Sequence, residues 1–436
     1  MSIHPLGRFP SLAKRRLPFL LDGGPVPGGE CSMMGADPHR LLRCYGNQVE
    51  WEERSPSGTR FERRQADPLM ALQEAAGRRD YAIAIGFLSY DLGRQIESVP
   101  SLSTNELGLP DMHFAFYSDV IRHERSAPSP GRKASEDDGQ AIPAVEDGCG
   151  RLSSSLPATQ YRHAVAQARQ HLMAGDIYQV NLCQRIRVSM PPHCSPFSLY
   201  RRLRAESPAP FGAFLDLGDF QVLSNSPERF LRLDRPSGRL ETWPIKGTCR
   251  RDDDPRRDAE AARALQADPK ERAEHIMIVD LERNDLGRVC SPGSIGVEGM
   301  LRVESFAHVH HLVSTVRGQL PRNVGLAEIL RATFPGGSIT GAPKVKAMEI
   351  AERLEPTRRG IYCGALGYLL PDGSFDLNLT IRTAVIRDGH AHIYAGGGVV
   401  ADSTPEGELR ESWLKATAFL KALGAQPTDA ELVLGS

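Results

Sequence analysis

Hairpins of extended chain constrain the fold more than any other feature of this sequence. Apolar residues alternate or cluster between turn residues at 211–234, 362–386 and 390–401, and a longer strand is predicted at 177–190. Helical periodicity is found at 159–172, where Thr159 is the predicted cap, and at 257–266, 270–287, 326–333, 343–354 and 406–423. Hairpins with helices interspersed predict an α+β body on large antiparallel sheets, rather than a doubly wound parallel sheet.

A segment rich in Ser, Pro, Gly and acidic residues divides the chain at 125–158. It carries almost no large apolar side chains, so we interpret it as a flexible connection. It separates an N-terminal part, 1–124, from a segment at 159–425 that holds every concentrated motif, and a tail follows at 426–436. Such a connection is compatible with two domains and equally with two halves of one sheet system.

Charge and cysteine usage exclude several classes of function. The formal net charge of −1 provides no general field for nucleic acid or an anionic membrane, so neither is an expected partner. The 8 cysteines form no C-x-x-C pair, which argues against a zinc site or a disulfide framework. Neither a signal peptide nor an apolar run of membrane-spanning length is recognisable, and we expect a cytoplasmic protein.

Two pairs of glutamates are the strongest candidates for a metal site. Glu271 and Glu274 share one face of a predicted helix, and Glu408 and Glu411 share one face of another. Brought together, the two faces would form an oxygen-rich site of the kind that Mg²⁺ prefers. Each pair alone is equally compatible with a solvated helix surface.

Glycines and basic side chains predict anion recognition. Gly396, Gly397 and Gly398 directly follow a predicted strand, and the loop at 336–344 precedes a helix, so backbone N–H groups could approach an anion at both places. The P-loop spacing is absent. Arg382 is predicted in mid-strand among apolar neighbours, where a guanidinium needs an anionic partner, either a ligand or an internal carboxylate.

Lys246 and Glu228 are candidates for chemistry. Lys246 lies between an apolar strand end and a Gly-Thr turn, and desolvation there would lower its amine pKa and free a nucleophile or base. Glu228, on the preceding hairpin, could act as a general acid if its environment raises its pKa. An exposed lysine and a surface carboxylate are the alternatives. His311 could be either a core histidine or a ligand.

Seven motifs in chain order resemble the signature series of the chorismate-utilising enzymes. They are SPERF, PIKGT, AEHIMIVDLERNDLGRV, HHLVS, GGSITGAPK, TIRT and AGGGVVADS, within 159–423, and GFLSYDLGR at 86–94 extends the resemblance weakly. The family includes anthranilate, aminodeoxychorismate, isochorismate and salicylate synthases. The resemblance implies one body of two large, mostly antiparallel sheets packed together, with helices outside and the active site between the halves.

The resemblance also implies roles for individual residues. Glu274 and Glu411 would ligate Mg²⁺, with Glu271 and Glu408 supporting the ion and its waters. The residues implied to bind chorismate are Arg382 and Tyr362 at the enolpyruvyl carboxylate, with backbone at Gly396, Gly397 and Gly398, and Ser338, His311 and Lys415 on the ring side.

Two positions indicate which reaction is expected. Family members that add water carry a lysine where this chain has Gln179, and anthranilate synthases typically read PIAGT where this chain reads PIKGT. The resemblance therefore implies an aminodeoxychorismate synthase of the p-aminobenzoate and folate pathway, in which Lys246 attacks the substrate and Glu228 protonates the departing hydroxyl. An anthranilate synthase subunit and a non-catalytic chorismate-binding subunit are the alternatives.

Ammonia is expected to come from a separate protein. A glutaminase would carry a G-x-C-x-G nucleophile with a downstream His-x-Glu, and the sequence has neither; DGCGR, around Cys149, has the wrong glycine spacing. A glutaminase subunit is the expected partner, with free ammonia as a possible substitute.

Overall fold

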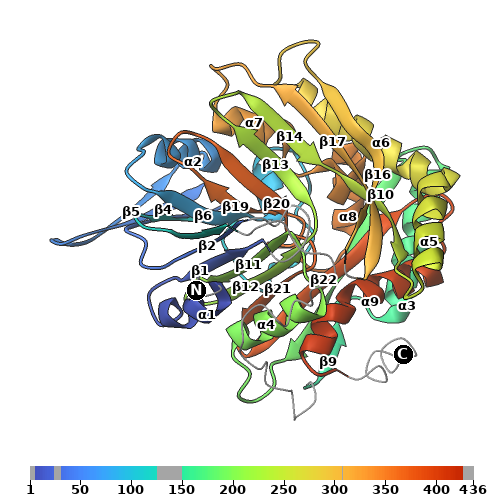
Figure 1. Ribbon diagram of the computed structural model, residues 1–436, viewed down its shortest axis with the longest axis horizontal. Coiled ribbons are helices and arrows are strands. Elements are labelled where there is room, and N and C mark those ends of the chain that lie inside the picture. The colour runs from blue at the N-terminus through green and yellow to red at the C-terminus, as the bar shows by residue number, and fades with distance from the viewer. Residues whose placement is uncertain (1–4, 24–30, 125–149, 307, 426–436) are drawn as a thin grey trace.

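The computed structural model describes residues 5–23, 31–124, 150–306 and 308–425, and these form two large antiparallel sheets (Figure 1). In spatial order the ten-stranded sheet contains β18 (Gly341–Ala342), β10 (Gln179–Ser189), β22 (His390–Val399), β21 (Thr383–Arg387), β12 (Gln221–Ser226), β11 (Phe211–Asp216), β1 (Phe19–Asp22), β2 (Cys31–Gly35) and β8 (Ile121–Glu124), with β9 (Leu152–Ser154) beside β10. The twelve-stranded sheet contains β15 (Ile245–Arg250), β17 (Val309–Gln319), β14 (Arg239–Trp243), β13 (Arg229–Asp234), β20 (Phe375–Leu379), β19 (Ala365–Leu369), β6 (Ile83–Leu88), β7 (Met112–Tyr117), β3 (Arg40–Tyr45), β4 (Gln48–Ser55) and β5 (Gly58–Gln65), with β16 (Gly296–Ser305) beside β17. The predicted α+β class is confirmed.

The described helices are α1 (Pro5–Leu12), α2 (Pro68–Gly77), α3 (Ala158–Met173), α4 (Pro196–Glu206), α5 (Pro255–Ala267), α6 (Pro269–Gly287), α7 (Leu326–Thr333), α8 (Lys344–Leu354) and α9 (Pro405–Ala422), with the 3-10 turns η1 (Tyr90–Gln95) and η3 (Gly337–Ile339). Five of the described helices, α2, α4, α5, α6 and α9, begin where a polar cap precedes proline. Asp254, Asp268 and Thr404 each accept backbone N–H groups ahead of a proline, which starts α5, α6 and α9 slightly earlier than predicted. The predicted Thr159 cap is wrong, because α3 already begins at Ala158.

The apolar residues form layers around the two sheets. Between the sheets, Phe19, Leu215 and Val222 of the ten-stranded sheet pack with Ile85 and Phe87 of the twelve-stranded one. The outer face of the twelve-stranded sheet is covered by α2, α6 and α7, and that of the ten-stranded sheet by α3, α4 and α9 (Figure 1). Apolar burial on both faces explains why the strands of these sheets are rich in Leu, Ile, Val and Phe.

Two crossings of the chain from one sheet to the other lie side by side. After β12 the chain passes through Pro227 and Glu228 into β13, and after β20 it passes through 380–382 into β21. The Leu379 N–H donates to the Glu228 carbonyl at 3.0 Å, and the Asn225 N–H donates to the Arg382 carbonyl at 3.0 Å. The prediction of Arg382 in mid-strand is therefore wrong: it lies at a crossing, with φ of 47°.

The N-terminal segment shares both sheets with the rest of the chain. β6 pairs with β19, and β1 pairs with β11. Of the predicted flexible connection, 125–149 lies outside the described residues, whereas Leu152–Ser154 forms β9 and pairs with β10, so the connection ends earlier than predicted. The tail at 426–436 also lies outside the described residues.

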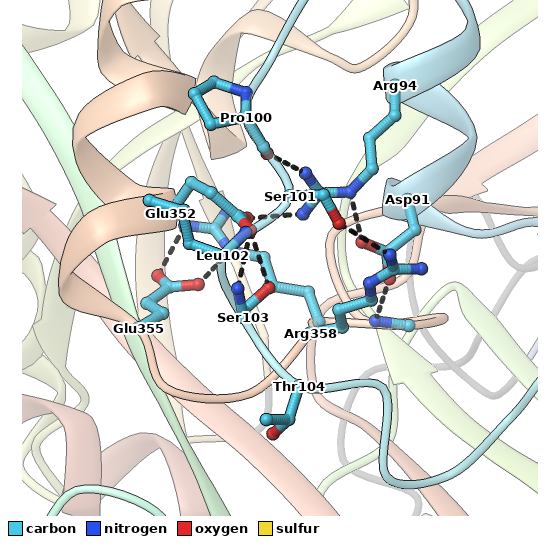
Figure 2. Close-up of polar contacts among 12 residues, drawn as sticks. Asp91, Arg94, Pro100, Ser101, Leu102, Ser103, Thr104, Glu352, Glu355 and Arg358 are labelled. Atoms are coloured by element: carbon cyan, nitrogen blue, oxygen red, sulfur yellow. Dashed lines mark hydrogen bonds and ion pairs between the residues drawn. The ribbon is translucent and has the colours of Figure 1, made fainter.

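A polar network fastens the segment after η1 to α8 (Figure 2). Glu352 of α8 accepts the N–H groups of Leu102 and Ser103 at 2.6 and 2.8 Å, and pairs with Arg94. Asp91 accepts the Gly360 N–H at 2.9 Å. α8 follows the loop at 336–344, so these contacts tie the N-terminal part of the chain to the helix that comes after that loop. No helix within the described ranges has the length and apolarity needed to span a membrane.

Candidate active site

Lys246 and Glu228 lie together where β13 and β15 begin. Glu228 is 4% exposed, and its Oε1 accepts the N–H of Ile245 at 3.4 Å, which places the carboxyl beside the residue that precedes Lys246. His275 of α6 faces the Lys246 carbonyl, with its Nδ1 at 3.2 Å, and its Nε2 lies 2.7 Å from the Ser314 hydroxyl. The backbone of Lys246 is thus held by α6 while its side chain reaches into the site.

Burial shifts both groups toward their uncharged forms. It raises the pKa of Glu228 to about 7, although the Ser338 hydroxyl and the Lys246 charge act in the opposite direction. Burial, reinforced by the charge of Lys415, lowers the pKa of Lys246, against the pull of Glu274, Glu228 and Glu411. A protonated carboxyl beside a neutral amine is a suitable pair for acid catalysis and nucleophilic attack.

The two glutamate pairs face Lys246 from different helices, α6 and α9. Glu274 and Glu411 both lie close enough to act on the pKa of Lys246. Burial raises the pKa of Glu408, and burial together with Glu274 raises that of Glu271. Burial also acts to raise the pKa of Glu411, but Lys415, at 2.7 Å, lowers it overall. Carboxylates of opposite helices therefore converge on one lysine.

A hard cation is chemically compatible with these carboxylates. The Oε2 atom of Glu408 is buried and has no hydrogen-bond partner within the described residues, and such an oxygen needs a proton or a cation. Nowhere in the described ranges do three or more His, Cys, Asp or Glu side chains come close enough to hold a metal by themselves. Mg²⁺ would thus need water or substrate oxygens as further ligands, as it commonly does.

The three glycines of β22 leave room for the groups around them. A Cβ atom on Gly397 would lie 2.9 Å from Glu408 Oε2 and 3.3 Å from Glu411 Oε1. One on Gly398 would lie 2.9 Å from the side-chain amide of Gln179 and 3.2 Å from Lys246 Nζ. The strand therefore approaches the acidic pair at one residue and Lys246 at the next, which only glycine allows without displacement.

Gly398→Ala is expected to lower kcat/KM by roughly tenfold or more, because the new methyl group would displace Lys246 Nζ and Gln179. Steady-state kinetics on the folded variant would measure this. Gly296→Ala in β16 is the matched control, since a Cβ there meets nothing within 4 Å. Equal activity of both variants would contradict the close approach of Gly398 to the lysine.

The remaining predicted substrate-binding residues fall into two groups. His311 lies near Arg382, and its Nδ1 is 2.8 Å from the hydroxyl of Thr248, just after Lys246 in the chain. Burial lowers the pKa of His311 to about 3, so it is neutral at ordinary pH. Ser338, in η3, lies beside Glu228. Tyr362 forms the second group: its ring stacks on that of Tyr394, with ring centroids 5.5 Å apart.

Comparison with known proteins identifies the family. A family model described as chorismate binding enzyme matches residues 27–421. The chain belongs to this family. It is 41% identical over 399 residues to anthranilate synthase component 1 of Thermus thermophilus, covering 84% of each chain. It is 38% identical over 418 residues to aminodeoxychorismate synthase component 1 of Escherichia coli, covering 91% of this chain and 90% of the relative.

The fold agrees with a solved structure of the same family. Anthranilate synthase component I from Streptococcus pneumoniae superimposes with a TM-score of 0.75 at 30% identity, covering 90% of this chain and 92% of that one. Relatives with either activity in their names are thus similar to about the same extent. They establish the family of chorismate binding enzymes, and the reaction has to be argued from the site.

Two residues of the site were not predicted from the sequence. His275 directly follows Glu274 and lies on the buried face of α6, so its helical position was an available signal for a role near the site. Arg229 follows Glu228 within SPERF, but its partners, Trp243 and Asp376, come from other strands. Only the strand pairing brings these three side chains together.

Proposed function

We propose that the protein is an aminodeoxychorismate synthase, which converts chorismate and ammonia to 4-amino-4-deoxychorismate for p-aminobenzoate and folate biosynthesis. The observation that carries the proposal is the position of Lys246 Nζ, between the Glu228 carboxyl and Gly398. A lysine at this position supplies a nucleophile. The alanine of the PIAGT form, which anthranilate synthases typically have at this position, could not. Gln179, which is also beside Gly398, offers no base for adding water.

The proposed reaction consists of two displacements across the ring diene. The neutral Lys246 amine forms a bond to carbon 2 as the carbon 4–oxygen bond breaks, and Glu228 donates the proton with which the hydroxyl leaves as water. Ammonia then forms a bond to carbon 4, the carbon 2–lysine bond breaks, and the surplus proton of the new ammonium returns to Glu228. Dividing one difficult substitution into two is the usual gain from covalent catalysis.

Other residues would hold the substrate. Arg382 would bind a carboxylate, since its partly buried guanidinium has no hydrogen bond or ion pair from any residue that the structure describes. Tyr362 and the backbone of the three glycines, with His311, Ser338 and Lys415 around the ring, remain proposed contacts. Glu274 and Glu411, supported by Glu271 and Glu408, would hold Mg²⁺. When bound, this ion would supply positive charge to a ring carboxylate.

Ammonia would be supplied by a glutaminase subunit. The relatives from Thermus thermophilus and Escherichia coli are both named component 1, which supports a second component for this chain as well. The purified chain should then aminate chorismate with ammonium salts but not with glutamine.

Anthranilate synthesis is the second candidate, because relatives with that name are equally similar. The deciding experiment incubates the purified chain with chorismate, Mg²⁺ and ¹⁵N-labelled ammonium and identifies the products by mass. A labelled amino product that retains the enolpyruvyl group and that an added lyase converts to p-aminobenzoate supports the proposal. Fluorescent anthranilate with release of pyruvate would overturn it, and no turnover in any arm would favour a non-catalytic subunit. Chelation with EDTA and re-addition of Mg²⁺ tests the ion requirement.

A further inference from the structure

Arg229 is a buried arginine that directly follows Glu228 in the chain and connects three strands. Its side chain is 4% exposed. Its Nε and Nη2 atoms donate to the two carboxylate oxygens of Asp376 in β20, at 2.9 and 3.0 Å. This bidentate pairing fixes the plane and the direction of the guanidinium as well as its position.

The same guanidinium stacks on an aromatic ring of the neighbouring strand. Its central carbon lies 3.6 Å from the ring centroid of Trp243, the cross-strand partner of Arg229 in the β13–β14 pair. The ring centroid of Phe211 lies 5.2 Å from the same guanidinium carbon. β13 lies between β14 and β20 (Figure 1). Arg229 holds it to β14 by stacking and by a 3.5 Å contact of Nη1 with Glu241, and to β20 by the ion pair with Asp376.

Both residues of the pair lie at the starts of strands of the twelve-stranded sheet, Glu228 just before β13 and Lys246 as the second residue of β15. Glu228 immediately precedes Arg229, and only Pro244 and Ile245 separate Trp243 from Lys246. β13 pairs with both of its neighbours at Arg229 and changes register with both just after it, so the ladder is irregular next to this end of the strand. The stacked and paired guanidinium adds a side-chain constraint to the backbone pairing there.

A buried ion pair contributes little net stability by itself, because the cost of removing both charges from water offsets their attraction. Two buried charges often contribute no more than well-packed apolar side chains of similar volume would. Burial raises the pKa of Asp376 although Arg229 acts to lower it, so desolvation works against the charged form of this carboxyl. Fixed geometry is what the planar arginine fork provides and a lysine cannot.

On the basis of the proposed function, we propose that Arg229 is a positioning residue that sets the separation between the Glu228 carboxyl and the Lys246 amine. Its position determines how the strand ends at 228 and 243 face each other. The 3.4 Å hydrogen bond from the Ile245 N–H to Glu228 depends on the same alignment.

Arg229→Lys in the full-length chain tests the proposal. We expect kcat for 4-amination to fall on the order of 100-fold, the usual consequence of misplacing reacting groups by about 1 Å. KM for chorismate should change by less than about twofold, because the substitution touches none of the groups assigned to substrate. Arg232→Lys, on an exposed position of the same strand, is the matched control and should retain wild-type kcat.

The pH profile separates positioning from loss of stability. Glu228 is faced by Lys246 of β15, Ser338 of η3 and Lys415 of α9, and it acts on Glu282 of α6. Withdrawing Lys246 and the Ile245 N–H removes two influences that lower the Glu228 pKa, so the alkaline limb should move to higher pH in Arg229→Lys. A smaller fraction of folded enzyme would reduce the rate without moving this limb.

Asp376→Asn provides a second variant, which retains one carbonyl acceptor and the side-chain shape. It should show the same shift of the alkaline limb with a smaller loss of kcat. If folded Arg229→Lys and Asp376→Asn both keep the wild-type kcat and pH profile, the positioning role is overturned. The identity of the wild-type product is measured first, so that an error in the proposed function is recognised independently of either variant.

Discussion

Replacing Lys246 with alanine is expected to remove 4-amination almost entirely, by roughly a thousandfold or more, because no other nucleophile takes its place near carbon 2. The amine lies between Glu228, Gly398 and the two glutamate pairs, and its pKa is lowered mainly by burial. Mass analysis of products formed with labelled ammonium would measure the loss. Mg²⁺ binding should persist, since the four glutamates remain.

The control for this experiment is an exposed lysine on the same body. Lys421→Ala in α9 removes a side chain that is 59% exposed and pairs only with Glu206 among the described contacts, so its turnover should match the wild type. Thermal unfolding of both variants would confirm that they fold. Unchanged 4-amination in Lys246→Ala would eliminate the covalent route, whereas new formation of anthranilate and pyruvate would assign to this lysine the choice between the two reactions.

Replacing Glu228 with glutamine is expected to lower turnover by about 100- to 10,000-fold, the range typical for loss of a general acid. The amide cannot donate the proton with which the hydroxyl leaves. The pH dependence is the more specific measurement. Because burial raises the Glu228 pKa to about 7, the carboxyl is protonated below that pH and loses its proton above it. The wild-type rate should therefore fall as pH rises through about 7.

The acid limb of the same profile has the opposite cause. Lys246 must be neutral to attack, and its lowered pKa brings that form nearer to neutral pH, so the rate should fall again as the amine becomes protonated at lower pH. The residual activity of Glu228→Gln should lack the alkaline limb and retain the acid one. Glu328→Gln, an exposed position in α7, is the control. An alkaline limb that survives in Glu228→Gln would assign the general acid to another group.

The fold class could be predicted because hairpin turns and capped helices are local signals. Prolines after Asp254, Asp268 and Thr404 specify helix starts without help from the rest of the molecule. The assignment of each strand to a sheet could not be predicted, because the two sheets share an apolar core and their strands have similar patterns. The run at 211–234 resembles one series of hairpins, yet β11 and β12 belong to one sheet and β13 to the other.

The same limit applies to the candidate site. The spacing of Glu408 and Glu411 on one helix face was enough to pair them, and the structure places both beside Gly397. Arg382 was expected in mid-strand, because a sequence pattern does not show where a chain leaves a sheet. His275 and Arg229 act through the Lys246 carbonyl and through Asp376 and Trp243, and contacts of this kind exist only after the strands have paired.

The pairing of β6 with β19 has a consequence for the order in which this protein can fold during synthesis. Residues 83–88 find their hydrogen-bonding partners only at 365–369, after most of the chain has left the ribosome. Until then one edge of β6 is open and its apolar side chains are uncovered, a condition that favours association with other nascent chains. We expect folding to be slow and dependent on chaperones, and a fragment truncated before 365 to remain insoluble.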